Sequence, residues 1–366
     1  MLAAAAFVVA AGSIPQARKI RAIASCALSA ELPVTSEGRV ARSASAAQRA
    51  PGSWRERVHP IVPWLIGLAA LLPLPLLMPN AYHQYVVNVI CINILLAVGL
   101  NIVKGFAGQI TVGHIALMAI GAYASAVISK NFGVPFWGAL PLAMLVTAGA
   151  GILIGIPALR LEGAYLALAT LGLAESVRII ISGTEYLGAA IGFENIPPPH
   201  LFGRALDGHY AYYFVVMPVA LIGIYFSFSI LSSDIGRAFK SIREDQLAAA
   251  ASGVNVAKYK VIAFVLSALY AGCAGSLKAH MAPGFLNPND YTLQEMVTLL
   301  LMVIFGGVGH IWGGVIGAIA VTIINDLTQD YYTYRMAIFG MIIVLTVMYM
   351  PRGIGGYIDD FFVRRR

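Results

Sequence analysis

The chain has 366 residues, of which 59% are hydrophobic and only 11% are charged, and its formal net charge is +7. Soluble globular domains carry about a quarter of their residues as charged side chains, so this composition excludes a soluble protein and indicates a polytopic membrane protein. Most of the Lys and Arg residues flank apolar runs, where membrane orientation and anionic lipid account for the positive charge, so nucleic-acid binding is not expected.

Residues 1–58 differ in composition from the rest of the chain. A short apolar run, Leu2 to Ala11, precedes an Ala/Ser/Arg-rich tract. In a secretory signal the positive charges come before the apolar run, whereas here Arg18, Lys19 and Arg21 come after it. The run is also too short to span a bilayer. We expect a disordered cytoplasmic extension; the alternative is that translation starts further downstream.

A transmembrane domain is expected over residues 59–352, followed by a cytoplasmic tail at 353–366. Apolar windows long enough to span a bilayer follow one another closely in this domain. We expect helices over 61–79, 84–103, 111–129, 136–157, 161–181, 210–231, 260–281, 293–309, 311–326 and 335–350. The sequence therefore predicts an all-α inner-membrane bundle of about 8 to 10 transmembrane helices.

The distribution of charge predicts which connections share a side of the membrane. With both termini in the cytoplasm, an even number of crossings places most of the basic connections inside. These are Lys104, Arg160, the segment from Asp234 to Lys260, and Arg352, Arg364, Arg365 and Arg366. The connections 182–209 and 281–292 then face outward. The count of ten is open, because either Gly-rich segment, 105–113 or 305–314, could be a broken or re-entrant helix.

The two Gly-rich segments resemble each other. Val112 to Ile115 and Ile120 to Ala122 recur as Val308 to Ile311 and Ile316 to Ala318 at the same spacing. This suggests internal duplication, and Gly-interrupted pairs in transporters point toward the transport path. The alternative is that small residues only let helices pack closely. The predicted crossings give both copies the same direction, which an inverted repeat would not.

The segment 232–260 is a charged island between two apolar runs. Arg237, Lys240, Arg243, Lys258 and Lys260 lie there with Asp234, Glu244 and Asp245. Strong helix formers follow Gly236, and Gly253 stands where a left-handed residue would end the helix. We expect one helix at the cytoplasmic membrane surface, with its small-residue face, Ala248 to Ala251, docking into another protein. The alternative is an ordinary solvated loop.

Polar residues inside apolar spans are the other candidates, because a charge at the bilayer centre costs about 2.5 to 3.5 kcal/mol. The candidates for a translocation pathway are Asn93, Asn101, Gln109, Thr111, His114, Thr170 and Glu175, and Asn88, Glu162 and Arg178 lie near them. Interhelical hydrogen bonding is the alternative for the amides. Glu175 and Arg178 are three residues apart and can neutralise each other. A proton relay through Glu175 or His114 is a weaker alternative.

Motifs for catalysis are absent from the sequence. No Gly-Lys pair occurs, so the chain lacks a phosphate-binding G-x-x-x-x-G-K-[ST] loop, and neither H-E-x-x-H nor C-x-x-C is present. The cysteines Cys26, Cys91 and Cys273 lie far apart, so no disulfide or metal framework is expected. We expect no catalytic residue and no cofactor in this chain, and any energy from a nucleotide must enter through a partner.

Five blocks of this sequence carry a resemblance to a known family. The first covers the island, GRAFKSIREDQLAAAASGVNVAKYKVIAFVLSALYAGCAGSL, and the others are LNIVKGFAGQITVGHIALMAIGAYASA, PALRLEGAYLALATLGLAE, VIFGGVGHIWGGVIGA and IPPPHLFG. In their order along the chain they resemble the LivM/LivH permeases, the membrane subunits of ABC importers for branched-chain amino acids, and the island is similar to the cytoplasmic coupling segment of that family. The LivM branch fits better than LivH, because of the block PALRLEGAYLALATLGLAE and the long outer connection.

The resemblance implies an importer whose partners are a second, LivH-like permease, two cytoplasmic ATPases that bind ATP and Mg, and a periplasmic binding protein. Its expected substrates are leucine, isoleucine and valine. The ATPase-coupling residues would be Gly236, Arg237, Arg243, Glu244, Asp245, Ala249 and Gly253. Where the family usually has a Glu in the Ala-rich part, this chain has Ala250 and Ala251. The outer segment SGTEYLGAAIGFEN also departs from the family pattern.

Two alternatives to this function stay open at the sequence level. The first is an importer of the same architecture for urea, short amides or another amino acid. The second is an ion-coupled carrier that works alone. A membrane-embedded enzyme is the least favoured alternative, because no convergent set of acid, base or metal ligands is present.

Overall fold

A computed structural model describes residues 80–161, 163–201, 204–206, 208–328, 335–349 and 353–355. All of them belong to the compact unit Pro60–Arg366. The predicted N-terminal extension, the predicted helix at 61–79, Glu162 and the end of the tail lie outside the described residues.

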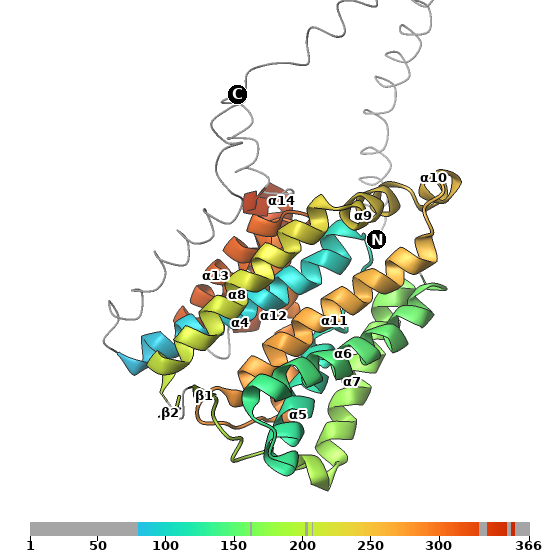
Figure 1. Cartoon of the computed structure of the whole chain (residues 1–366). Coiled ribbons are helices and arrows are strands. Elements are labelled where there is room, and N and C mark those ends of the chain that lie inside the picture. Colours follow the sequence, from blue (N-terminus) through green and yellow to red (C-terminus); the bar gives the residue numbers. More distant parts are fainter. Residues whose placement is uncertain are drawn as a thin grey trace, which may run out of the picture. The chain divides into compact units, whose positions relative to one another are not determined.

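The described residues form a helical membrane bundle, which confirms the predicted fold class (Figure 1). The elements are α4 (Ala81–Asn101), the π-helix η3 (Ile102–Phe106), α5 (His114–Phe132), α6 (Phe136–Ala158), α7 (Ala164–Gly183), η4 (Glu185–Leu187), β1 (His200–Leu201), β2 (Arg204–Ala205), α8 (His209–Ser232), α9 (Asp234–Glu244), α10 (Gln246–Ala251), α11 (Val256–His280), η5 (Pro288–Tyr291), α12 (Leu293–Gly306), α13 (Ile311–Leu327) and α14 (Arg335–Tyr349). The strands pair antiparallel, with His200 opposite Ala205.

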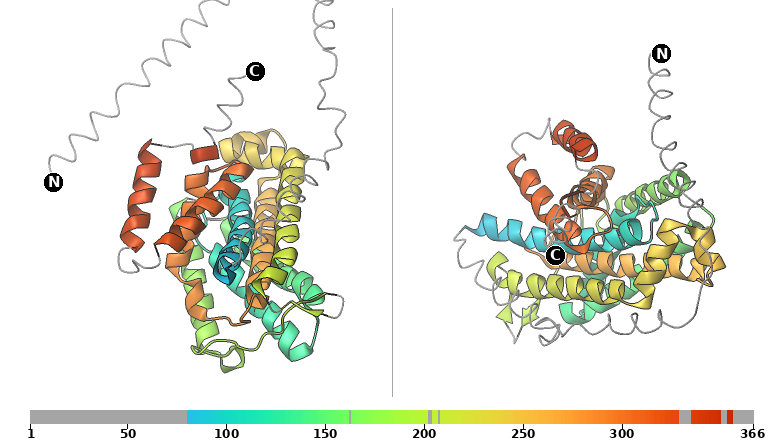
Figure 2. Two further views of the ribbon diagram at one scale, coloured as in Figure 1. Left: turned by 90° about the vertical axis from the view of Figure 1, so that its left-hand side faces the viewer. Right: turned by 90° about the horizontal axis from the view of Figure 1, so that it is seen from above.

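Two long helices, α4 and α11, form the centre of the bundle. One side of α11 packs against α5 and α6, while α4 packs against α8, α12 and α13. Both central helices are mostly buried, whereas less than a third of α6 and of α7 is buried. Figure 2 shows α14 at the edge of the bundle, next to α12. Because exposed apolar helix surface is stable in lipid, this arrangement suits a membrane.

Within the described residues, six helical segments are long and apolar enough to cross a membrane: α4 with η3, α5, α6, α7, α8 and α11. The apolar helices α12 and α13 are shorter. The predicted helix ranges agree with the observed ones, and the main differences lie at the Gly-rich segments. There α4 continues as a π-helix to Phe106, α5 begins only at His114, and α12 ends at Gly306.

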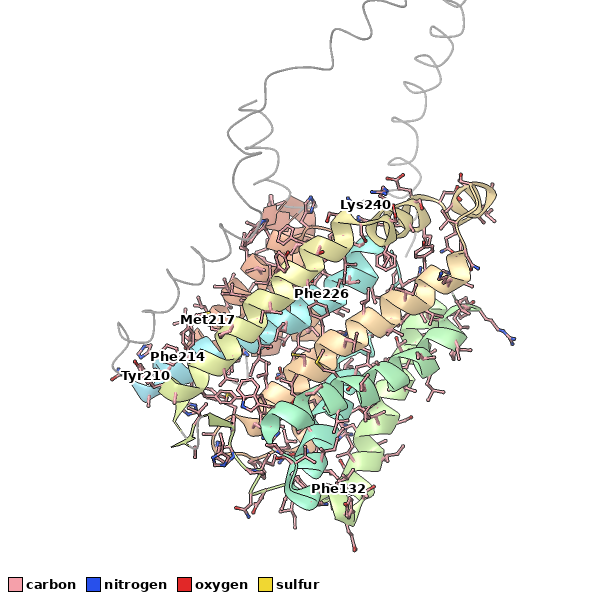
Figure 3. All side chains as sticks on the ribbon, in the orientation of Figure 1. Phe132, Tyr210, Phe214, Met217, Phe226 and Lys240 are labelled. Carbon is pink, nitrogen blue, oxygen red and sulfur yellow. The ribbon has the colours of Figure 1, made fainter. Side chains whose placement is uncertain are left out.

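The two ends of the bundle differ in which connections they carry. One end, which we call the coupling face, carries η3 and the loop after it, the helices α9 and α10, and the turn 307–310 (Figure 1). The opposite end carries the long connection between α7 and α8 and the segment 281–292. In Figure 3, Lys240 lies at the coupling face and Phe132 and Tyr210 lie at the other end. The Gly-rich segments thus connect η3 to α5 and α12 to α13 on the side of the coupling face.

The directions of α5 and α13 can be compared with the suggested duplication. Both α5 and α13 follow a Gly-rich turn and run away from the coupling face. The two copies therefore have the same direction, as the predicted crossings required. A Cβ on Gly121 would lie 2.5 Å from the Cα of Gly272, and one on Gly317 would lie 1.9 Å from the carbonyl oxygen of Met302. Both glycines thus allow close helix packing, which is the other role that the sequence left open.

Candidate functional site

The charged island forms two helices and not the single helix that the sequence predicted. Helix α9 begins at Asp234, where the Ser233 side chain accepts a hydrogen bond from the amide of Ile235. Asp245 is extended, and its carboxylate accepts hydrogen bonds from the amides of Leu247 and Ala248 at 2.8 and 3.0 Å. An aspartate in this position is a strong N-cap, so a new helix starts there despite the surrounding helix formers. Gly253 has a φ of +86°, the left-handed conformation that was predicted.

Arg243, near the end of α9, is exposed, but its guanidinium reaches back to the end of the bundle. Its Nη1 donates a hydrogen bond to the backbone carbonyl of Gly105 in η3. A Cβ on Gly309 would lie 2.3 Å from Nη1, and one on Gly108 would lie 3.2 Å from the Arg243 Cα. Glycine at these two positions therefore lets the arginine lie against both Gly-rich segments. The Arg243 side chain of α9 thus lies against both η3, which leads to α5, and the turn between α12 and α13.

Asn101, the last residue of α4, joins the same two segments. Its side-chain oxygen accepts a hydrogen bond from the amide of Gly309 at 2.9 Å, and its side-chain nitrogen donates one to the carbonyl of His310 at 2.8 Å. The residue is 1% exposed. Both halves of this amide are used between α4 and the turn before α13, which is an interhelical contact of the kind that the alternative interpretation expected. We call Arg243, Asn101, Gly105 and Gly309 the coupling junction.

Thr170 of α7 holds the loop between η3 and α5. Its hydroxyl accepts a hydrogen bond from the amide of Val112 at 3.0 Å and donates to backbone carbonyls one turn earlier in α7. A Cβ on Gly113 would lie 2.9 Å from the Thr170 carbonyl oxygen. Within the loop, Thr111 accepts from the amide of Gly113, and the buried Gln109 side chain donates to the carbonyl of Ala107. These contacts fix the loop beside the coupling junction.

The remaining amide and histidine candidates connect helices deeper in the bundle. Asn93 of α4 donates to Thr322 of α13 at 2.9 Å, and Asn88 donates to the carbonyl of His209 at 2.8 Å. His114 Nδ1 lies 2.9 Å from the Ser267 hydroxyl of α11. Each contact joins α4 or α5 to another helix. The structure therefore brings Asn101, Gln109, Thr111, His114 and Thr170 near one loop, while Asn93 and Asn88 lie progressively farther along α4.

Glu175 lies apart from this group, on the peripheral helix α7. It forms an ion pair with Arg178, whose Nε lies 3.0 and 3.1 Å from the two carboxylate oxygens. The pairing of the two residues is confirmed. The Glu175 side chain is 46% exposed, so it faces outward from this chain. It has no contact with the coupling junction.

The charged island packs mainly apolar residues against the bundle and exposes charged residues on its opposite surface. Gly236, Phe239 and Ile242 face the bundle, and a Cβ on Gly236 would lie 2.3 Å from the carbonyl oxygen of Leu231. Arg237 forms an exposed ion pair with Asp234, and Glu244 is exposed. On α10, Ala249 is buried whereas Leu247 is 84% exposed. A single exposed leucine is common on protein surfaces, so the candidacy of Leu247 as a partner contact rests on its place in the charged island.

Comparisons with known proteins identify the family. The family model for the branched-chain amino acid transport system / permease component matches residues 83–347. The permease protein LivM of Salmonella typhimurium is 34% identical over 287 residues, which are 72% of this chain and 67% of the relative. LivM of Escherichia coli is 33% identical, with 78% and 74% covered, and LivH of Escherichia coli is 25% identical, with 72% and 90% covered. The chain belongs to this permease family. No solved structure matches it.

The opposite end of the permease carries a connection that sequence reasoning missed. Phe193 and Leu286 exchange backbone hydrogen bonds at 2.8 and 3.0 Å, and the amide of Ile196 donates to the carbonyl of Gly284 at 3.1 Å. His280 Nδ1 lies 2.7 Å from the carbonyl of Pro197, so Nδ1 carries the proton. The features of the sequence that could have indicated this pairing are the Ile-Pro-Pro-Pro run at 196–199 and the glycines Gly192 and Gly284.

This connection reaches into the membrane domain of the permease through buried serines. The Nε2 of His280 lies 3.1 Å from the Ser125 hydroxyl, which lies 2.7 Å from that of Ser276. All three side chains are at most 1% exposed. Because the Nδ1 of His280 donates to Pro197, Nε2 accepts from Ser125. The connection between α7 and α8 is therefore tied to α5 and α11 by a satisfied polar chain.

Replacing Thr170 with valine should loosen the loop before α5 without disturbing the helix bundle. Valine keeps the shape but leaves the amide of Val112 without its acceptor, which costs about 1–3 kcal/mol when the group is buried. We expect a lower thermal midpoint of the purified permease and faster amide exchange at residues 109–113, measured by hydrogen–deuterium exchange. The control is Thr346→Val, a buried hydroxyl that donates only to its own helix at Ile342. Equal exchange at 109–113 in both variants would contradict the role of Thr170.

Proposed function

We propose that this permease carries leucine, isoleucine and valine across the inner membrane into the cytoplasm as one membrane subunit of an ABC importer. Support comes from its relatives, whose names describe high-affinity branched-chain amino acid transport. Its proposed partners are a second, LivH-like permease, a periplasmic binding protein and two ATPases that bind ATP and Mg. The coupling face and both chain termini are cytoplasmic in this proposal, since the basic connections gather on that side.

The coupling junction is the observation that carries the proposal. Arg243 belongs to the surface helix α9, yet it contacts the carbonyl of Gly105 and lies against Gly309. A motor that displaces α10 and α9 would therefore pull on the connections that lead into α5 and α13. A ligand shifts a conformational equilibrium only through different contacts in the two states, so the ATPase must grip this surface differently when it binds ATP.

The hydrogen bonds between α4 and α13 support a location for the translocation pathway. Asn93 and Asn101 are hydrogen-bonded to α13 and to the turn before it in the state described here. For the side-chain nitrogen of either residue to bind substrate, its present hydrogen bond must open. We propose that the pathway opens along α4 and α13 when the coupling junction moves, and that the candidates near the junction are exposed in that step.

Uptake measurements separate this function from an ion-coupled carrier. Cells that express the complete importer should accumulate labelled leucine when ATP is present, and uptake should survive an ionophore that collapses the proton and sodium gradients. Excess isoleucine or valine should compete with leucine. Loss of uptake with the gradient while ATP is maintained would favour the lone carrier. Competition by urea or short amides, and not by valine, would favour the other substrate class.

A further inference from the structure

A cavity of about 530 Å³ lies at the coupling face beside the coupling junction. Its walls come from η3, the end of α8, the helix α9 and the start of α13, and the lining includes Phe106, Phe228, Ser232, Lys240, His310 and Trp312. In Figure 3, Lys240 lies at the end of the bundle, where α9 crosses the end of α8. The cavity is therefore at the level where the spanning helices leave the membrane.

The polar part of this cavity favours an anion. Lys240 supplies a full positive charge, and among the described residues that line the cavity there is no Asp or Glu. Helix α13 begins at this wall with neither a side-chain cap nor an acidic residue in its first turn. The amides of a first helical turn add a further attraction for negative charge.

The apolar part of the cavity opens toward the membrane. The rings of Phe228 and Trp312 are 5.5 Å apart, and Trp312 is 53% exposed. Below them, Ile319 and Ile323 lie on the same face of α13 as Trp312, and both are exposed. Tryptophan is enriched at the interface between lipid headgroups and acyl chains. A molecule seated here would have its charged end at Lys240 and its apolar end along α8 and α13.

We propose that this cavity binds the phosphate headgroup of an anionic phospholipid, such as phosphatidylglycerol, from the cytoplasmic leaflet. The Lys240 ammonium pairs with the phosphate, and the acyl chains follow the apolar surface past Trp312. A free phosphate ion would use Lys240 but would leave the aromatic wall without a role. A lipid uses both parts of the cavity. Because Lys240 belongs to α9, the bound lipid would also hold the coupling helix at the membrane surface.

Binding of short-chain lipids to the purified full-length permease tests this proposal. After delipidation, dioctanoyl phosphatidylglycerol is titrated while the thermal midpoint and the tryptophan fluorescence are recorded. We expect saturable binding to the natural protein and about fivefold weaker binding to Lys240→Gln, since a surface lysine contributes about that factor toward an anionic lipid. The matched control is Lys258→Gln, another exposed lysine of the island that does not line the cavity. It should bind as the natural protein does.

Two comparison ligands distinguish a phospholipid headgroup from a free phosphate ion as the bound anion. Dioctanoyl phosphatidylcholine should bind more weakly than phosphatidylglycerol, and inorganic phosphate should neither shift the midpoint nor compete at millimolar concentration. Equal affinity of the Lys240 and Lys258 variants would overturn the proposal, as would competition by phosphate alone. A Lys240→Gln variant that keeps full lipid binding but no longer retains the ATPase would assign the cavity to a protein partner instead.

Discussion

Replacing Gly317 with alanine should prevent α12 and α13 from packing against each other. A Cβ at this position would lie 1.9 Å from the Met302 carbonyl oxygen and 2.9 Å from the Cα of Gly306. Both are backbone atoms, so no side chain can move aside and the helices must separate. Overpacked helices commonly lose about 1–3 kcal/mol, and the close approach to backbone here places the effect at the upper end, at ~3 kcal/mol. Thermal unfolding of the purified permease measures this loss.

The control for this prediction is Gly172→Ala in α7. A Cβ there would meet no atom within 4 Å. Alanine is a better helix former than glycine by up to about 1 kcal/mol, so this variant should be as stable as the natural permease or more stable. If Gly317→Ala unfolds at the same temperature as Gly172→Ala, then α12 and α13 are not in the close contact described here.

Helix positions could be predicted because they depend on local sequence. Apolar windows bounded by Pro, Gly or charge located α6 and α8 to within one residue. The division of the island was missed because helix propensity was weighed over the whole run from Arg237 to Ser252. Asp245 instead competes with the helix by capping the amides of Leu247 and Ala248. A search for N-caps inside helical runs would have found this break.

The coupling junction could not be predicted, because its contacts join residues distant in sequence. Asn101 and Gly309 are hydrogen-bonded although they are 208 residues apart. Sequence reasoning placed Asn101 among polar residues of unknown partner, and it placed Arg243 on a surface for docking. Only the fold shows that the Arg243 guanidinium contacts the carbonyl of Gly105. The resemblance between the two Gly-rich segments was the available signal, since both provide the space that the arginine and the asparagine occupy.

Docking of the ATPase and transmission of its motion should be separable by two substitutions in the island. Leu247 is 84% exposed, so Leu247→Glu removes an apolar contact from the outer surface of α10 and leaves the bundle intact. A hot-spot residue of an interface contributes about 2 kcal/mol, so with Leu247 in that role we expect roughly thirtyfold weaker binding of the ATPase and a similar loss of uptake. Leu247→Met, which keeps the apolar side chain, should retain both. Co-purification and leucine uptake provide the two measurements.

Arg243→Ala should have the opposite pattern. Because Arg243 contacts Gly105 and Gly309 inside the chain, its removal should leave the ATPase bound but should disconnect α9 from the helices that follow the two turns. ATP hydrolysis should then continue while uptake falls at least about tenfold, since one charge-assisted hydrogen bond contributes about 1.5–3 kcal/mol. Arg243→Lys retains the charge but not the reach of the guanidinium, so its effect should be intermediate. If Arg243→Ala releases the ATPase as Leu247→Glu does, Arg243 belongs to the docking surface and the coupling junction transmits nothing.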